Sequence, residues 1–385
     1  MNMANRAAVV GVGRSYPAHS DPPRDIYDLA LNALSGALDD AGLAYRDIDG
    51  LITNRISSYG RLAELCGIDP DYTLATPGHG RFCGICIQTA ALLVESGMVR
   101  TVALVYSNDS KSSNTSYGGG PNGYGGAAGA YGTSDLHWAP YGMTSPGAIH
   151  ALMMQRHMHR FGTREEHLGE VASTFRRHAA LNPDAVMKTP FTLADYLEAR
   201  PICAPLRLLD YCLINDGAVA MIITSSDRAK DCRKKPVFIR AAAQASKLDG
   251  SSLPPDDFWF APMSKVAGDV YRRSGVSRNE LDGLMIYDNF TPTVLFTLEG
   301  FGFCPVGESG NWVSEGHLQL GADFPANTNG GHLSDSYLQG WGLNAEAVRQ
   351  VRGECGARQI PDANFIQYMA ASPIVTSIIY GREAT

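Results

Sequence analysis

The most constraining feature of this chain is a segment that occurs twice. Residues 42–52 (GLAYRDIDGLI) align without a gap with residues 275–285 (GVSRNELDGLM). In both copies a glycine follows a helical pattern, a charged turn comes next, and an Asp-Gly pair leads into an apolar run. Because helix, turn and strand occur twice in the same order, the sequence predicts an α/β fold built by internal duplication.

The remaining apolar runs fit this interpretation. Runs at 7–13, 102–105, 219–223 and 235–239 predict buried strands, and helical periodicity predicts helices over 25–41, 86–96 and 345–351. We therefore expect a first half at 1–232 and a second at 233–385, with a long loop insertion over about 109–205. The Gly- and Tyr-rich opening of the insertion, 117–132, fits either a flexible connection or a loop that covers a pocket or partner surface.

Composition excludes several classes of function. The chain has 385 residues and a formal net charge of -7, so it lacks the concentrated basic face that nucleic-acid binding requires. No apolar stretch is long enough to predict a membrane span. The eight cysteines are scattered, and a chain of this length needs no disulfides to build a core, so we expect reduced thiols and a cytoplasmic location.

Two segments carry candidate chemistry. Tyr287, Asp288 and Asn289 directly follow an apolar strand, and ligands of α/β sheets bind at the carboxyl ends of strands. The paired Gly330 and Gly331, followed by His332, allow close backbone approach. Such a turn either offers N–H groups to an oxyanion or is purely structural, and the residues alone leave both readings open.

Cys83 and Cys86 have the spacing of a redox or metal pair. No second pair with ligand spacing accompanies them, and their neighbours are apolar. Structural burial is therefore the favoured interpretation.

Over nearly its whole length the sequence resembles the thiolase superfamily, in particular the sterol-carrier-type thiolases and the related bacterial lipid-transfer proteins. The resemblance is carried by four stretches: RHMHRFGT at 156–163, RHAALNP at 177–183, PLRLLD at 205–210 and NDGA at 215–218. It implies the five-layered αβαβα thiolase fold with two similar halves.

The departures from the family pattern are informative. Counting along the chain puts the family's nucleophilic cysteine near Gly80-Arg81, and Cys83 lies about three residues too late. The family's His-Asp-Cys-Phe motif corresponds to YDNF at 287–290, its Gly-His-Pro motif to SYL at 336–338, and its second cysteine falls within QYMA at 367–370. Both histidine positions therefore hold tyrosine, which resembles the steroid side-chain aldolases among the lipid-transfer proteins.

This resemblance implies retro-aldol cleavage of a β-hydroxyacyl-CoA, with a steroid 17-hydroxy C22-CoA giving a 17-ketosteroid and propionyl-CoA. Such a reaction needs a base and an acid but no covalent nucleophile. We expect Tyr287 and Tyr337 in these roles, in either order. Asn289, Gly330, Gly331 and His332 are expected to bind the substrate or its oxyanion. No metal or cofactor is expected, since coenzyme A belongs to the substrate.

The resemblance further implies a homodimer, formed through the strand at 102–105, within a heterotetramer with a partner that carries an OB fold and a zinc ribbon. Two other functions stay open. One is a thiolase-like acyltransferase that uses Cys83 or Cys86, and the other is a non-catalytic scaffold that binds acyl-CoA. The aldol chemistry is also compatible with an acyl group other than a steroid.

Overall fold

The computed structural model describes residues 7–15, 25–78, 80, 82–115, 145–249 and 254–384. Its main sheet has nine strands in the order β3-β2-β4-β7-β1-β8-β11-β10-β9. The strands of the N-terminal half are β1 (Ala7–Ser15), β2 (Gly50–Asn54), β3 (Tyr72–Thr76), β4 (Thr101–Asp109) and β7 (Asp216–Ser225). Those of the C-terminal half are β8 (Val237–Ser246), β9 (Gly283–Ile286), β10 (Phe365–Ala370) and β11 (Ile374–Gly381).

The repeated segment forms the same structure in both halves. Helix α1 (Ile26–Ala41) ends at Gly42 with φ 72°, and α10 (Phe260–Ser274) ends at Gly275 with φ 67°. A short 3-10 helix follows each glycine, and β2 or β9 comes next. The strand order β2-β4-β7-β1 also matches β9-β10-β11-β8. The duplication predicted from the sequence is thus present in the topology, while the boundary at 232/233 stays a prediction.

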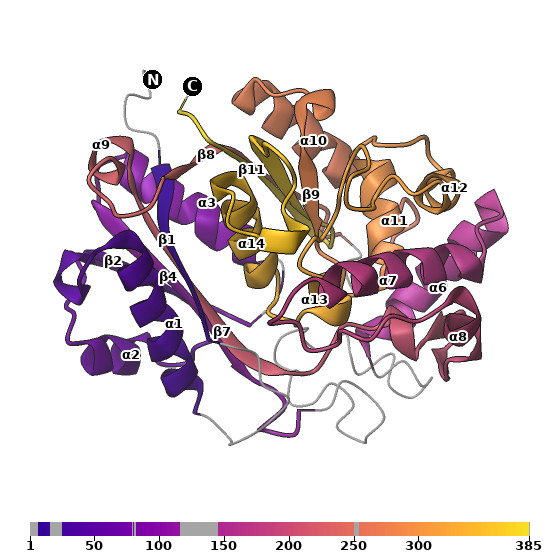
Figure 1. Ribbon diagram of the computed structural model, residues 1–385, viewed down its shortest axis with the longest axis horizontal. Helices are drawn as coiled ribbons and strands as arrows, with labels where there is room; N and C mark the ends of the chain where they lie inside the picture. Colours follow the sequence, from indigo (N-terminus) through magenta and orange to yellow (C-terminus); the bar gives the residue numbers. More distant parts are fainter. Residues whose placement is uncertain are drawn as a thin grey trace.

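The helices sort into outer and central layers. Helix α1 packs on β1, β7 and β4, and α10 packs on β8 and β11, so each covers the outside of its own half. Helices α3 (Phe82–Glu95) and α14 (Trp341–Arg352) contact strands of both halves. Figure 1 shows α14 between the strands of the two halves, with α1 and α10 on the outside. This is the predicted five-layered arrangement, and the N-termini of the two central helices lie at the candidate site.

The insertion over 109–205 is not the long loop that we predicted. Among its described residues it forms α6 (Pro146–Phe161), α7 (Glu165–Ala180) and α8 (Leu193–Glu198), with a small sheet of β5 (Pro201–Cys203) and β6 (Leu206–Arg207). Helix α7 packs against α11 (Thr291–Gly300), α12 (Ser309–Ser314) and α13 (Gly331–Ser334) of the C-terminal half. The Gly/Tyr-rich segment at 117–132 lies outside the described residues.

The prediction that the strand at 102–105 forms a dimer interface is wrong for a geometric reason. This segment lies in β4, whose two sides are hydrogen-bonded to β2 and β7, so β4 has no free edge. Edge positions of the sheet belong instead to β3 and β9. The N-terminal half also contains two short helices, α2 (Tyr59–Cys66) and α9 (Ser226–Ala229). Within the described residues, no helix has the length and apolar character needed to cross a bilayer.

Candidate active site

Two tyrosine hydroxyls meet between the central helices. Tyr287 follows β9, and its N–H donates to the carbonyl of Met369 on β10 at 2.8 Å. Tyr337 lies in the turn before α14. The hydroxyl oxygens of Tyr287 and Tyr337 are 2.9 Å apart, a hydrogen bond in which either group can donate. The structure therefore brings together the two residues that the sequence predicted as acid and base.

Gly80, just before α3, lies directly against Tyr287. A Cβ atom built on Gly80 would stand 1.7 Å from the hydroxyl oxygen of Tyr287. No side chain fits there unless the tyrosine moves. Tyr287 thus fills the space in which a nucleophile at position 80 would lie, and this steric exclusion agrees with the absence of a cysteine there.

His332 packs beside the tyrosine pair without a hydrogen bond to either hydroxyl. Its ring centroid is 4.6 Å from that of Tyr287 and 5.2 Å from that of Tyr337. Its Nε2 accepts from the N–H of Gly340 at 2.9 Å, and its Nδ1 faces Asp288 at 3.3 Å. Burial lowers its pKa to about 3, so the ring is neutral with its proton on Nδ1. The ring packs against both phenols, and the oxyanion role of His332 stays a prediction.

Asp288 and the glycine pair form a closed turn. Asp288 accepts from the N–H groups of His332 and Leu333, while burial raises its pKa well above the ordinary value. The N–H of Gly330 donates to the carbonyl of Asn327, and that of Gly331 donates to Oδ1 of Asn329. Both donors are occupied, so the geometry favours the structural reading of this turn over the oxyanion reading.

Backbone conformation and close contacts also require glycine at positions 330 and 331. Gly330 has φ 106° and Gly331 has φ 63°, a region that disfavours other residues. A Cβ on Gly330 would lie 2.5 Å from Cβ of Ala179, and one on Gly331 would lie 2.1 Å from Oδ2 of Asp288.

Asn289, two residues after Tyr287, is half-buried. Its Oδ1 accepts from the hydroxyl of Thr293 at 2.8 Å, and its carbonyl accepts from the N–H of Cys212 at 3.0 Å. Among the described residues, its amide nitrogen has no hydrogen-bond acceptor. Asn289 therefore keeps a donor for a substrate oxygen.

Cys83 and Cys86 are poor nucleophiles here. Both are fully buried, and burial raises the pKa of the Cys83 thiol well above its ordinary value and that of Cys86 to about 11. The sulfur of Cys83 also accepts from Nδ2 of Asn344 at 3.2 Å. Because the thiolate is the reactive form, this environment argues against the acyltransferase reading.

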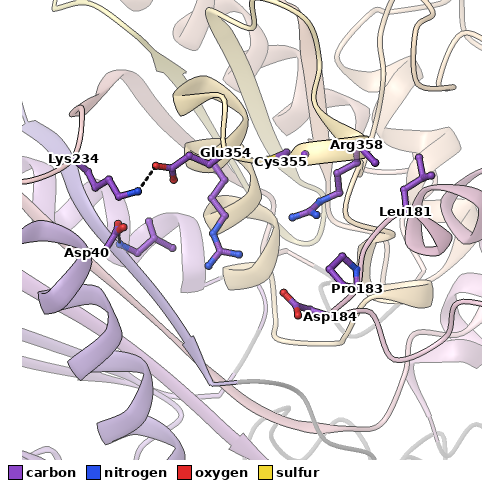
Figure 2. A pocket seen from close by; sticks show the side chains of 12 residues that line it. Asp40, Leu181, Pro183, Asp184, Lys234, Glu354, Cys355 and Arg358 are labelled. Atoms are coloured by element: carbon purple, nitrogen blue, oxygen red, sulfur yellow. Dashed lines mark hydrogen bonds and ion pairs between the residues drawn. The ribbon is translucent and has the colours of Figure 1, made fainter.

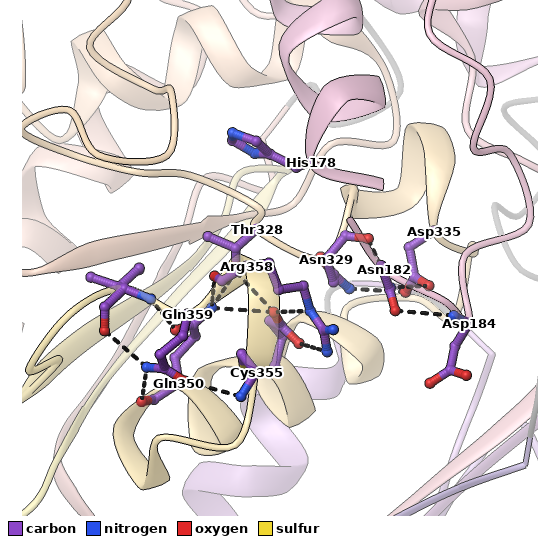
Figure 3. A network of polar contacts seen from close by, with 12 residues as sticks. His178, Asn182, Asp184, Thr328, Asn329, Asp335, Gln350, Cys355, Arg358 and Gln359 are labelled. Atoms are coloured by element: carbon purple, nitrogen blue, oxygen red, sulfur yellow. Dashed lines mark hydrogen bonds and ion pairs between the residues drawn. The ribbon is translucent and has the colours of Figure 1, made fainter. Parts of the chain in front are cut away.

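The loop that carries Tyr337 is held by residues that the sequence analysis did not single out. Asp335 accepts from Arg14 on β1 at 2.9 Å, and this ion pair is almost fully buried. Asn182 and Asn329 also donate to Asp335, as Figure 3 shows. Arg14 and Asn182 lie 321 and 153 positions from Asp335, so no local pattern could have revealed these two contacts.

A hollow with a volume of about 610 Å³ lies at the C-terminal end of α14. Figure 2 shows its charged lining, in which Lys234 pairs with Glu354 at 2.8 Å. Arg358 also lines this hollow and pairs with Glu346 at 2.8 Å. Neither tyrosine lines this space, so we do not assign the reaction to it.

Comparison with known proteins identifies the family of this chain. The family model described as thiolase C-terminal domain-like matches residues 245–372. A steroid side-chain-cleaving aldolase of Thermomonospora curvata is 34% identical, over 98% of this chain and 98% of its own length. The chain belongs to the thiolase superfamily, with the side-chain-cleaving aldolases.

Two further proteins are similar to this chain over most of their length. A 17-hydroxy-3-oxo-4-pregnene-20-carboxyl-CoA lyase of Mycobacterium tuberculosis is 34% identical over 91% of this chain and 92% of its own length. The solved Ltp2-ChsH2(DUF35) aldolase superimposes with a TM-score of 0.88 at 31% identity, covering 98% of this chain and 97% of that one. The thiolase fold expected from the sequence is confirmed.

Proposed function

We propose that this aldolase cleaves a β-hydroxyacyl-CoA by a retro-aldol reaction in which Tyr287 and Tyr337 are the catalytic residues. The observation that carries the proposal is the 2.9 Å hydrogen bond between their hydroxyls, at a place where a covalent nucleophile is sterically excluded. A pair of acid–base groups is what a retro-aldol reaction requires. Neither a metal nor a separate cofactor is needed for it.

In the proposed mechanism Tyr287, as the phenolate, takes the proton of the β-hydroxyl. The bond between Cα and Cβ breaks, and the two electrons of this bond form the thioester enolate. The β-carbon becomes the carbonyl carbon of a ketone. Tyr337 then protonates Cα to give the shorter acyl-CoA. The proton that Tyr287 gained passes to Tyr337 across the direct hydrogen bond, which restores the pair. The same balance holds if the two roles are exchanged.

The pair supplies the stabilisation that a tyrosine base needs. An isolated tyrosine has a pKa of about 10, and a hydrogen bond donated to the phenolate favours ionisation. Tyr337 is positioned to donate this bond to Tyr287. The adjacent N-terminus of α14 adds a favourable dipole for the phenolate and the enolate, and Asn289 is the proposed donor to the thioester oxygen.

For the substrate we propose a steroid CoA thioester with a 17-hydroxyl group and a C22 side chain, which gives a 17-ketosteroid and propionyl-CoA. The support is the name of the Mycobacterium tuberculosis lyase, together with the identity over most of both chains. A different β-hydroxyacyl-CoA is the alternative for the same two tyrosines.

We further propose a homodimer that binds a partner protein with an OB fold and a zinc ribbon, in the cytoplasm. The structural match to the Ltp2-ChsH2(DUF35) aldolase supports a second protein in the assembly. All eight cysteines lie among the described residues and are free thiols, which suits a reducing compartment.

The test is product analysis by mass spectrometry. The chain and a co-expressed OB-fold partner are mixed with a 17-hydroxy steroid-22-oyl-CoA. We expect propionyl-CoA and a 17-ketosteroid, without consumption of free CoA. Tyr287→Phe and Tyr337→Phe should each lower kcat by about 10²- to 10⁴-fold, since each removes one proton-transfer group.

Circular dichroism should show both variants folded, because each loses only a hydroxyl. Near-normal turnover in both would refute the assignment. Binding of acyl-CoA without cleavage of any β-hydroxyacyl-CoA would support the scaffold function instead.

A further inference from the structure

The two catalytic tyrosines are held by different halves of the molecule. Tyr287 is fixed by β9 and β10 of the C-terminal half, through the hydrogen bond from its N–H to Met369. Tyr337 also belongs to the C-terminal half by sequence, but its backbone is bound by residues of the N-terminal half. The distance between the hydroxyls therefore depends on how the N-terminal half holds Tyr337.

Asn215 makes the principal contact. Its Oδ1 accepts from the N–H of Tyr337 at 2.7 Å, and its Nδ2 donates to the carbonyl of Asp216 at 3.0 Å. Asn215 is fully buried just before β7. An amide N–H left unpaired in the interior costs about 1–3 kcal/mol, which is enough to favour a shift of the loop.

Asn108 on β4 completes the contact from the other side. Its Nδ2 donates to the carbonyl of Asn215 at 2.9 Å and lies 3.5 Å from the carbonyl of Tyr337. Its Oδ1 accepts from the N–H of Ser110 at 2.9 Å, which fixes the orientation of the amide. Asn215 thus binds the N–H of Tyr337, and Asn108 contacts its carbonyl.

We propose that Asn215 is the positioning residue that sets the catalytic distance between Tyr337 and Tyr287. This inference rests on the proposed function for its effect on turnover. Its structural part, the hydrogen bond between the two phenols, is independent of any substrate. A displacement of about 1 Å at a reacting group can cost about 10²-fold in rate, so the effect belongs in kcat and not in KM.

The test compares Asn215→Leu with Asn215→Asp. The leucine has a similar shape but no acceptor, and we expect kcat to fall about 10- to 100-fold with KM within about twofold. The aspartate keeps an oxygen that can accept from the N–H of Tyr337, so it should recover most of this loss. If Asn215→Leu does not fold, Asn215→Ser, which shortens the acceptor, takes its place.

Gln350→Leu is the matched control. Gln350 is equally buried, and its amide donates to Thr328 at 2.9 Å and to the carbonyl of Arg358 at 2.8 Å. It lies near the far end of α14, as Figure 3 shows. We expect its variant to lower the melting temperature without changing kcat.

A second readout needs no substrate. Ultraviolet absorbance rises with pH as tyrosines ionise to tyrosinate. The part of this rise that is contributed by the pair is the titration step that disappears in Tyr287→Phe. In Asn215→Leu this step should move to higher pH, toward its position in Tyr337→Phe, because the donated hydrogen bond is lost. Wild-type kcat in Asn215→Leu, or an unshifted titration, overturns the inference. If the wild type cleaves no substrate but the titration shifts, the proposed function fails and the positioning role stands.

Discussion

At the scale of single residues, one missing side chain decides which chemistry is possible. Gly80 has room for no Cβ because the hydroxyl of Tyr287 would lie 1.7 Å away. Tyr287, the proposed base, and a nucleophile at position 80 are therefore mutually exclusive in this arrangement.

We expect Gly80→Ala to reduce retro-aldol turnover by about 10²-fold, because Tyr287 must move by about 1 Å or more to admit the methyl group. The ring of Tyr287 can move by rotation about its side-chain bonds, so the free energy of unfolding should fall by only about 1 kcal/mol. Steady-state kinetics and thermal melts measure the two effects. Gly268→Ala is the control, since a Cβ there meets nothing within 4 Å and the helix should gain up to about 1 kcal/mol. Unchanged turnover in Gly80→Ala would contradict the steric argument.

The sequence was sufficient to find the tyrosines but not what holds them. Tyr287 and Tyr337 occupy positions that the family motifs mark, and they are in contact. Asn215 lies in a stretch that supported the resemblance, yet its bond to Tyr337 spans 122 positions. A hydrogen bond of that sequence separation leaves no periodic signal. The sequence left the role of the glycine pair open, because it does not show whether a backbone N–H group already has a hydrogen-bond acceptor.

At the scale of helices and strands, periodicity predicted the duplicated core correctly and missed most of the insertion. The core helices bury clean apolar stripes, such as that of α1. The buried face of α7 instead includes His167, Arg176 and His178, so its apolar stripe is interrupted. Polar residues on a buried face weaken a pattern that depends on hydrophobicity alone.

The edge strand β3 gives a prediction at this scale. It ends the sheet, and its side chains alternate between half-buried and exposed, as expected of a strand open to a partner. If the homodimer forms through this edge, Ala75→Arg should convert a species of twice 41.3 kDa to the monomer. Light scattering after size-exclusion chromatography measures this. Gln244→Arg on the interior strand β8 is the control, and a dimer that survives Ala75→Arg would exclude this edge.

At the scale of the whole molecule, the insertion and the C-terminal half are joined by buried polar groups. His178 on α7 donates from Nδ1 to the carbonyl of Ala326 at 2.9 Å, and its Nε2 accepts from the N–H of Leu320 at 3.1 Å. The ring must be neutral to make both bonds. Burial accordingly lowers its pKa from 6.5 to about 4.

This lowered pKa ties the stability of the molecule to pH. Below pH 6.5 His178 takes up a proton in the unfolded chain but stays neutral in the folded chain. The free energy of unfolding therefore falls as the pH drops from about 6.5 toward 4. At pH 5 the loss from this residue approaches 2 kcal/mol, at about 1.4 kcal/mol per pH unit. In His178→Gln the difference in unfolding free energy between pH 7 and pH 5 should shrink by that amount, as measured by urea denaturation. His159→Gln, which alters an exposed histidine, should keep the wild-type difference. Equal differences in His178→Gln and the wild type would show that another group carries the pH dependence.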